Sequence, residues 1–391
     1  MSEGLWLRAP DQATVHLELP FDAARMIRDW SSLLPSMARV RSEAFTRVEW
    51  AYLMTFLDAE NLWRPFLEEF GNPTEARGEG PVQSYRPRGQ VALWLPNNVS
   101  LLGPLAAILI SLSGCPMQIK LGSRGLDLVN AFFDFVRAHA PEGPLQDFLR
   151  DRVGMARFDR QDVRNQQMAA SAAVRMVFGS DQAARSIEDL PHPPTSLGIY
   201  FTDRLSEAWV EREALSEDVV LTLARVFAVY GRRGCTSPAR VVILGGTEKD
   251  ATALRDRLAT LWPRVMRSLC SQSQASECLM GHQLALARGW QSVLAPGHGA
   301  AFASGRGDLK ALEGTFVLPI TWSSPRDAAA ALPLNIQTIG YALKDPTEPG
   351  WTSLLAESGV KRFVPLGTMH HFGHVWDGIP YWRMLFEEAL T

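Results

Sequence analysis

Cysteine is scarce in this sequence. The 391 residues include only four, which are Cys115, Cys235, Cys270 and Cys278. No two of them have the C-x-x-C spacing of a zinc or redox site, and a chain of this length needs no disulfide bonds to hold a core together. Residues 1–11 also lack the basic region and apolar stretch of a secretory signal. We therefore expect a cytoplasmic protein with reduced cysteines.

An excess of charge of one sign is also missing. The sequence has 39 Lys and Arg against 42 Asp and Glu, a net charge of -3, so electrostatics give no reason to expect a nucleic-acid partner. Hydrophobic residues make up 46% and charged residues 21%, which is typical of a globular protein with a large core. The length favours two domains.

The sequence lacks an unbroken apolar run. Between Arg88 and Lys120 there is no charged residue, a length that exceeds the roughly 20 residues of a membrane-spanning helix. Proline, glycine and asparagine interrupt it, however, as at Pro96 and Gly114. These interruptions predict a strand at Val91–Leu95, a buried helix at Leu101–Leu112 and a strand at Met117–Leu121, with no membrane span.

Strands and helices alternate along most of the remaining chain, which predicts an α/β protein with a parallel sheet covered on both faces. The further strands that we expect are Ser196–Phe201, Val241–Leu244 and Phe316–Ile320, and the helices are Asp127–Ala138, Glu217–Tyr230 and Asp250–Leu261. Residues 1–85 predict short helical pieces separated by proline and glycine, with a loop at Gly71–Pro87. Ser216 can cap the helix that follows it, which favours a domain boundary near residue 215.

The most informative stretch surrounds Cys235. A helix ends at glycine, a Gly-Cys step follows, and a turn with proline leads into a strand. A cysteine thiolate is the reactive form, and Arg232 and Arg233 are close enough in sequence to lower the pKa of this thiol. Because cysteine is also a common small buried residue, local chemistry alone leaves a structural role for Cys235 open.

This stretch resembles the catalytic-cysteine signature of the aldehyde dehydrogenase superfamily, in which an arginine follows five residues later, as Arg240 does here. Leu95-Pro96-Asn97-Asn98 resembles a strand end of the same superfamily. The resemblance implies that the Asn98 amide and the backbone N–H of Cys235 hold an oxyanion. It also implies that Lys120 contacts the cofactor ribose, and that Gly179-Ser180 lies beside the cofactor pyrophosphate at a helix start.

Within the superfamily, the sequence is most similar to the branch of acyl-CoA reductases that supplies the fatty-acid reductase of bioluminescence. Six motifs follow the order of that branch, namely Pro96-Asn97-Asn98-Val99, Ser123-Arg124-Gly125-x-Asp127, Cys235-Thr236-Ser237-Pro238, Gln337-Thr338-Ile339-Gly340, Val364-Pro365-Leu366-Gly367 and Trp376-Asp377-Gly378.

Two departures from the wider superfamily refine the expected reaction. The stretch Tyr200–Ser206 has no glutamate at the place of the water-activating base, which disfavours oxidation to a free acid and favours exchange of the acyl group with a thiol. Ser123 followed by Arg124 replaces the acidic residue that binds the adenosine ribose, which suits the 2′-phosphate of NADPH. Glu313 is a weak match to the glutamate that contacts the nicotinamide ribose.

The resemblance thus implies an aldehyde-dehydrogenase-like α/β fold, with a Rossmann-type cofactor domain and an α/β catalytic domain. We expect a nucleotide-binding part at residues 1–215, a catalytic domain at 216–350, and a segment at 351–391 that packs back on the first domain. The expected activity is reduction of an acyl-CoA or acyl-carrier-protein thioester to an aldehyde, through a Cys235 thioester and with NADPH. Members of this architecture usually form homo-oligomers.

Two alternatives to this activity are a cysteine-dependent acyltransferase or thioesterase without a redox step, and a scaffold without catalysis. His370, His371 and His374 resemble a metal cluster, but no carboxylate or cysteine stands at diagnostic spacing, so a loop over the active site is the preferred interpretation and no metal is expected. Gly245-Gly246 is interpreted as a tight turn. Asp203, Glu207 and Asp377 are expected on the surface or as helix caps.

Overall fold

The computed structural model describes residues 4–74, 82–96, 99, 101–122, 127–231, 234–266, 272–307, 309–312, 316–347, 349–356 and 358–389. The chain divides into two compact units, and each is described by itself. The first unit comprises Met1–Thr202 with Phe372–Thr391, and the second comprises Asp203–His371.

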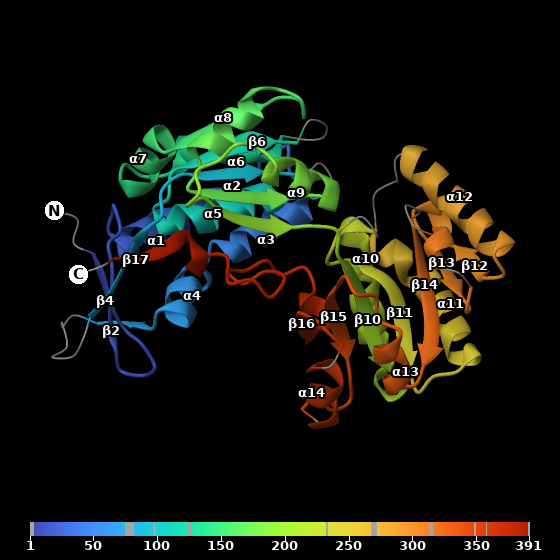
Figure 1. Ribbon diagram of the computed structural model, residues 1–391. Helices are drawn as coiled ribbons and strands as arrows, with labels where there is room; N and C mark the ends of the chain where they lie inside the picture. The colour runs from blue at the N-terminus through green and yellow to red at the C-terminus, as the bar shows by residue number, and fades with distance from the viewer. Residues whose placement is uncertain are drawn as a thin grey trace. The chain divides into compact units, whose positions relative to one another are not determined.

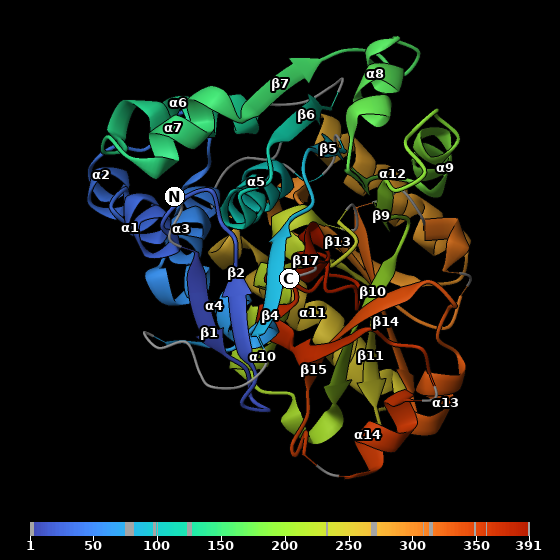
Figure 2. The same cartoon turned by 60° about the vertical axis from the view of Figure 1, so that its left-hand side comes forward.

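The first unit is built around a five-stranded parallel sheet with the order β7-β6-β5-β8-β9, of which β6 is labelled in Figure 1 and β5, β7 and β9 are labelled in Figure 2. Its strands are β5 (Val91–Trp94), β6 (Met117–Leu121), β7 (Val153–Arg157), β8 (Val174–Phe178) and β9 (Leu197–Phe201). From β5 the chain adds β6 and β7 on one side, and then returns to add β8 and β9 on the other. The direction of winding therefore reverses between β5 and β8, and the ends of these strands form the place where α/β sheets bind ligands.

The apolar run that resembled a membrane segment forms β5, α5 (Leu102–Ser113) and β6. Every residue of α5 is buried, because the helix packs inside the first unit. It ends at Gly114, which has a positive φ of 79°. Within the described part of the chain, no helix combines the length and the apolar character that crossing a bilayer requires.

Helices cover the sheet of the first unit. Ala92 and Trp94 of β5 pack with Met168 and Ala169 on one face of that sheet. The helices are α1 (Ala23–Ser31), α2 (Leu34–Arg39), α3 (Arg47–Phe56), α4 (Ala59–Glu69), α6 (Leu128–His139), α7 (Pro144–Asp151), α8 (Arg164–Ser171) and α9 (Asp181–Glu188).

A second sheet of the first unit joins the two ends of the chain, with the order β17-β4-β2-β1-β3. Its strands are β1 (Leu5–Arg8), β2 (Thr14–Leu17), β3 (Asn72–Pro73), β4 (Val82–Pro87) and β17 (Phe386–Ala389). In Figure 1 the red β17 runs beside the blue β4, in the register Phe386 with Pro87. Residues 1–85 contain the expected short helices, but the loop expected at Gly71–Pro87 was wrong where β3 and β4 form, because these short strands are stabilised by pairing with distant segments.

The second unit contains a seven-stranded sheet with the order β12-β13-β14-β11-β10-β15-β16, parallel except for the edge pair β12 and β13 (all labelled in Figure 1). The strands are β10 (Leu205–Glu211), β11 (Pro238–Leu244), β12 (Gln291–Leu294), β13 (Ala301–Ser304), β14 (Val317–Ser323), β15 (Ile336–Ala342) and β16 (Arg362–Pro365).

Alternate side chains of this sheet supply two cores. Val241 and Ile243 of β11 pack on one face with residues of α10 (Glu217–Tyr230), α11 (Glu248–Val265) and α12 (Gln272–Ala287). Val242 and Leu244 pack on the other face with residues of α13 (Pro325–Ala330) and α14 (Pro349–Ala356). Both faces are therefore buried, which explains the apolar run of β11.

The division into units differs from the boundaries expected at residues 215 and 350. It falls instead after Thr202 and after His371. The reason is pairing: β10 hydrogen-bonds to β11 and β15, and β16 hydrogen-bonds to β15, so both strands belong to the second unit. Ser216 still caps α10, accepting a hydrogen bond from the backbone N–H of Val219.

Candidate functional site

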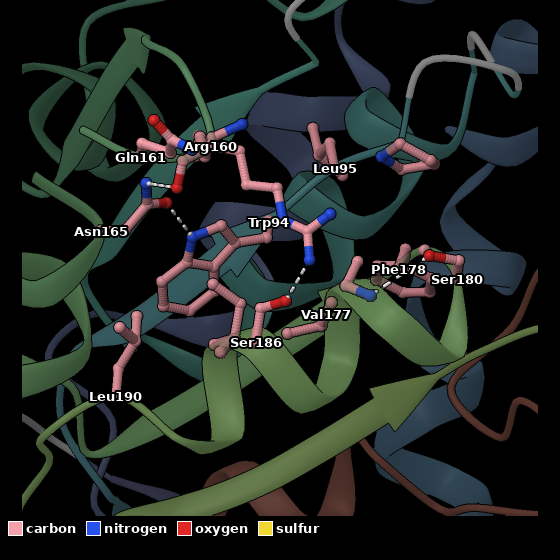
Figure 3. Close-up of a pocket in the computed structure, with 15 residues that line it drawn as sticks. Trp94, Leu95, Arg160, Gln161, Asn165, Val177, Phe178, Ser180, Ser186 and Leu190 are labelled. Atoms are coloured by element: carbon pink, nitrogen blue, oxygen red, sulfur yellow. Dashed lines mark hydrogen bonds between the residues drawn. The ribbon is translucent and has the colours of Figure 1, made fainter.

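A cavity of about 530 Å³ lies in the first unit at the carboxyl ends of its parallel strands (Figure 3). The last residues of β5, β6 and β8 and the segments that follow β5, β7 and β8 line it, because parallel strands end at the same edge of a sheet. The lining residues are Trp94, Leu95, Pro96, Lys120, Arg160, Gln161, Asn165, Val177, Phe178, Gly179, Ser180, Ala183, Ser186, Ile187 and Leu190.

Asn165 organises one wall of the cavity. Its side chain is buried, and its Oδ1 accepts a hydrogen bond of 3.0 Å from the indole Nε1 of Trp94. Its Nδ2 donates to the backbone carbonyls of Asp159, Arg160 and Asp162 at 3.0–3.1 Å. One amide therefore holds both the Trp94 ring and the loop that follows β7.

Two cationic side chains line the cavity. Arg160 reaches from the loop after β7 to α9, where its Nη2 donates to Ser186 Oγ (Figure 3). The Nζ of Lys120, near the end of β6, lies 5.5 Å from the centre of the Phe158 ring. Burial lowers the pKa of Lys120, and the neighbouring Asp159 carboxylate opposes that shift. The cavity thus offers positive charge beside an apolar wall.

The step from β8 to α9 provides a helix N-terminus at the same cavity. The Gly179 N–H donates to the Phe201 carbonyl at 3.0 Å, and Ser180 Oγ accepts from the Ala183 N–H at 3.2 Å. The first N–H groups of a helix and its dipole favour an anion at this end. Apolar residues of α9, including Ala183 and Ile187, continue the wall.

The structure brings together three of the residues predicted from sequence, since Lys120, Gly179 and Ser180 line one cavity. Asn98, Ser123, Arg124 and Glu313 lie outside the described residues, as do Arg232 and Arg233. Sequence reasoning missed Trp94, Arg160 and Asn165. Their positions in the sequence could have identified Trp94 and Arg160, because Trp94 is the last residue of β5 and Arg160 follows β7 closely.

The turn with Cys235 lies in the second unit, between α10 and β11. Gly231 ends α10 with φ of +60°, and a Cβ at this position would overlap the Phe316 ring, so glycine is required. Cys235 itself is half-buried. Its carbonyl accepts a hydrogen bond of 2.6 Å from Ser206 Oγ of β10, and the Ser237 N–H donates to the Gly234 carbonyl at 3.0 Å.

His370 contacts the same turn. Its Nδ1 lies 2.8 Å from Thr236 Oγ1, and its Nε2 lies 2.8 Å from the carbonyl oxygen of Val226 in α10. The Tyr230 ring meets the imidazole edge to face, with 5.1 Å between ring centres. Burial lowers the pKa of His370 to about 4, so the ring is neutral at neutral pH.

Arg240, five residues after Cys235, forms a buried ion pair with Glu207. Arg240 Nε lies 2.6 Å from Glu207 Oε1, and the Trp209 indole donates to Glu207 Oε2 at 3.0 Å. The expectation that Glu207 is a surface or capping residue was therefore wrong, because Arg240 and Trp209 compensate its burial. Asp377 is also buried, with 8% of its surface exposed.

His370 and His374 have different partners, each within its own unit. Both ring nitrogens of His370 take part in hydrogen bonds, and His374 belongs to the first unit, where its Nε2 lies 3.2 Å from Glu68 Oε2. Among the residues that the structure describes, no three His, Cys, Asp or Glu side chains are placed to hold a metal ion.

Comparison with solved structures defines the fold. An oxidoreductase from Marinobacter aquaeolei is similar with a TM-score of 0.67 at 13% identity, covering 95% of this chain and 86% of that one. Aldehyde dehydrogenase 21 from Physcomitrella patens, in complex with its product succinate, has a TM-score of 0.68 at 12% identity, with coverages of 95% and 86%. The P. syringae indole-3-acetaldehyde dehydrogenase AldA, in complex with NAD+ and IAA, has a TM-score of 0.62 at 10% identity, with coverages of 95% and 84%.

The protein therefore has the fold of the aldehyde dehydrogenases, as the sequence predicted. The family model of the acyl-CoA reductases (LuxC) matches residues 23–386, and the chain belongs to this family. This confirms the resemblance found in the motifs and supports an oxidoreductase that acts on acyl groups. No curated protein sequence matches significantly.

Proposed function

We propose that this protein reduces an acyl thioester, carried by CoA or by a carrier protein, to the aldehyde with NADPH as the reductant and Cys235 as the nucleophile. The observation that carries the proposal is the family match over residues 23–386, which includes both the Cys235 turn and the cavity with Lys120 and Ser180.

The cavity of the first unit fits an anionic dinucleotide. Lys120 and Arg160 supply cationic donors, and the N-terminus of α9 supplies backbone N–H groups for a pyrophosphate. The apolar residues of α9 suit the adenine ring. The expected preference for a 2′-phosphate follows from Ser123 and Arg124, and the two cations on the cavity wall support it.

The residues of the Cys235 turn suit an acyl-transfer step. The Cys235 thiolate adds to the carbonyl carbon of the thioester, the bond from that carbon to the donor sulfur breaks, and the donor leaves as its thiolate. The Cys235 N–H, and by resemblance the Asn98 amide, hold the oxyanion, at about 3 kcal/mol for each donor. Bound NADPH supplies the hydride that reduces the Cys235 thioester. The bond between the former carbonyl carbon of the acyl group and Cys235 Sγ then breaks, which releases the aldehyde and regenerates the thiolate.

The absence of a water-activating base favours thiol exchange over hydrolysis. The stretch that begins at Tyr200 has no glutamate at the place of this base. Burial raises the pKa of Tyr200, so its phenol stays protonated and cannot act as a base at neutral pH. An acyl group on Cys235 therefore leaves by reduction to the aldehyde or by transfer back to a thiol.

The test is thioester-dependent oxidation of NADPH. The purified protein should oxidise NADPH only when an acyl-CoA or acyl-carrier-protein thioester is present, across a panel of chain lengths, and should release an aldehyde. Cys235→Ala should lose this activity. Acyl transfer or thioester hydrolysis without NADPH oxidation across the panel would contradict the proposal.

A further inference from the structure

The turn that carries Cys235 is held from outside at two points, which are the carbonyl of Cys235 and the side chain of the next residue. Ser206 Oγ binds the Cys235 carbonyl at 2.6 Å, and the next side chain, Thr236, binds His370 at 2.8 Å. Thr236 is buried, with 4% of its surface exposed. The backbone around Cys235 is therefore fixed by partners on β10 and on the segment after β16.

The hydrogen bonds of His370 determine its tautomer. A carbonyl oxygen only accepts, so Nε2 must carry a hydrogen to donate to Val226. In the neutral ring, Nδ1 is then an acceptor, and the Thr236 hydroxyl donates to it. The two bonds use the two nitrogens of one rigid ring, so the imidazole links the last turn of α10 to the residue after the nucleophile.

His370 is itself held in place by the sheet. Met369 is fully buried and packs directly on Gly340 of β15, where a Cβ would overlap the methionine side chain. Arg362 of β16 donates through Nη1 to the Met369 carbonyl at 3.3 Å and through Nη2 to the His371 carbonyl at 3.1 Å. The backbone on both sides of His370 is thus anchored, and this fixes the position from which the ring contacts Thr236.

We infer that His370 is a positioning residue for Cys235: through its hydrogen bond to Thr236 it holds the turn in the conformation from which the thiol attacks the thioester. This inference rests on the proposed function, because it assigns His370 a role in the acylation step of the same site. His370 does not touch the acyl group in this account. It acts by restricting the backbone conformations of the turn, so that the Cys235 thiol stays where it can reach the thioester carbonyl.

Two conservative substitutions separate the bonds of the ring. In His370→Asn, the side-chain oxygen occupies the place of Nδ1 and accepts from Thr236, but the shorter side chain does not reach Val226. In His370→Gln, the amide nitrogen occupies the place of Nε2 and donates to Val226, but the bond to Thr236 is lost. Thr236→Val removes the same bond from the other side and keeps the size of the side chain.

The experiment measures the rate of Cys235 acylation by an acyl-CoA without NADPH, followed by intact mass. His370→Gln and Thr236→Val should each slow acylation about tenfold, which corresponds to about 1.4 kcal/mol, while His370→Asn stays within about threefold of the unaltered protein. The double variant with His370→Gln and Thr236→Val should be no slower than either single variant, because both remove one bond. Thr260→Val, at an exposed position of α11, is the matched control for Thr236→Val and should change nothing.

Hydrogen exchange of the backbone amides of the turn gives a second readout that needs no acyl donor. The peptide that contains Cys235 should exchange faster in His370→Gln and in Thr236→Val. Its exchange rate should be unchanged in His370→Asn. If the unaltered protein is not acylated, the proposed function fails, and the exchange rates still decide whether His370 holds the turn. Acylation and exchange at unaltered rates in Thr236→Val, or equal losses in His370→Asn and His370→Gln, would overturn the inference.

Discussion

Glu207 Oε1 of β10 lies 2.6 Å from Arg240 Nε of β11, and both side chains are largely buried. This ion pair joins the two central strands of the second unit directly after the Cys235 turn. Arg240 keeps the spacing from the cysteine that the superfamily signature shows. Its ion pair gives a structural reason for this spacing, because the Arg240 side chain binds Glu207 of the neighbouring strand and does not contact a substrate.

Breaking this pair should destabilise the second unit. Arg240→Met leaves the Glu207 carboxylate buried without its counter-charge, and we expect the free energy of unfolding to fall by about 3–5 kcal/mol. Adding Glu207→Leu should recover a large part of that loss. Urea unfolding of the single and double variants measures both effects. A loss below about 1 kcal/mol in Arg240→Met would place the pair among weak surface contacts.

Trp94 should report cofactor binding. It is the one tryptophan among the residues that line the cavity, so NADPH in this cavity should quench its fluorescence. In Trp94→Phe most of the quenching should disappear, although eleven of the twelve tryptophans in the sequence remain. Titration of NADPH against emission measures this change. Undiminished quenching in Trp94→Phe would mean that the cofactor binds elsewhere.

Lys120 should contribute to cofactor affinity and not to acylation. Lys120→Met removes a charged donor from the cavity, and we expect the dissociation constant for NADPH to rise at least about tenfold, or about 1.4 kcal/mol. The rate of Cys235 acylation without NADPH should stay unchanged. Lys361→Met, at an exposed position of the second unit, serves as the control for loss of one positive charge. A fall in acylation without weaker NADPH binding would contradict this assignment.

His370 should make the protein sensitive to acid. Its pKa is about 4 in the folded protein, against about 6.5 in an unfolded chain. Between these values the unfolded chain binds a proton that the folded protein does not. The free energy of unfolding is therefore fully retained above about pH 6.5, and it falls by up to about 3 kcal/mol as the pH drops towards 4.

Comparison with His370→Gln isolates this contribution. Burial also lowers the pKa of His282 and His374, but both titrate in either protein. Urea unfolding at about pH 7.5 and about pH 5 should show a smaller loss in the variant than in the unaltered protein. Equal losses would mean that His370 is not kept neutral by its surroundings.

The sequence predicted the elements with strong apolar periodicity and clear caps. Met117–Leu121 and Glu217–Tyr230 match β6 and α10 residue for residue. It did not predict β10, because Ser206 and Glu207 interrupt the apolar pattern, and their partners Cys235 and Arg240 are about thirty residues away. The short strands of the outer sheet were missed for the same reason, since β17 pairs with β4 across most of the chain.

Part of the cavity lining could be identified from motifs. Lys120, Gly179 and Ser180 were identified by resemblance to a strand end and a helix start of the superfamily, and they line one cavity. Trp94 and Arg160 were not predicted, because their meeting depends on the order of the strands in the sheet. His370 was interpreted only as part of a loop, since its contact with Thr236 joins residues that are 134 positions apart.

The mass of the intact protein after mixing with an acyl-CoA, before any NADPH is added, tests the central claim most directly. We predict that the protein gains the mass of one acyl group, that the adduct maps to Cys235, and that it disappears when NADPH is supplied. The absence of any adduct across acyl chain lengths, or an adduct that persists in Cys235→Ala, would contradict the claim.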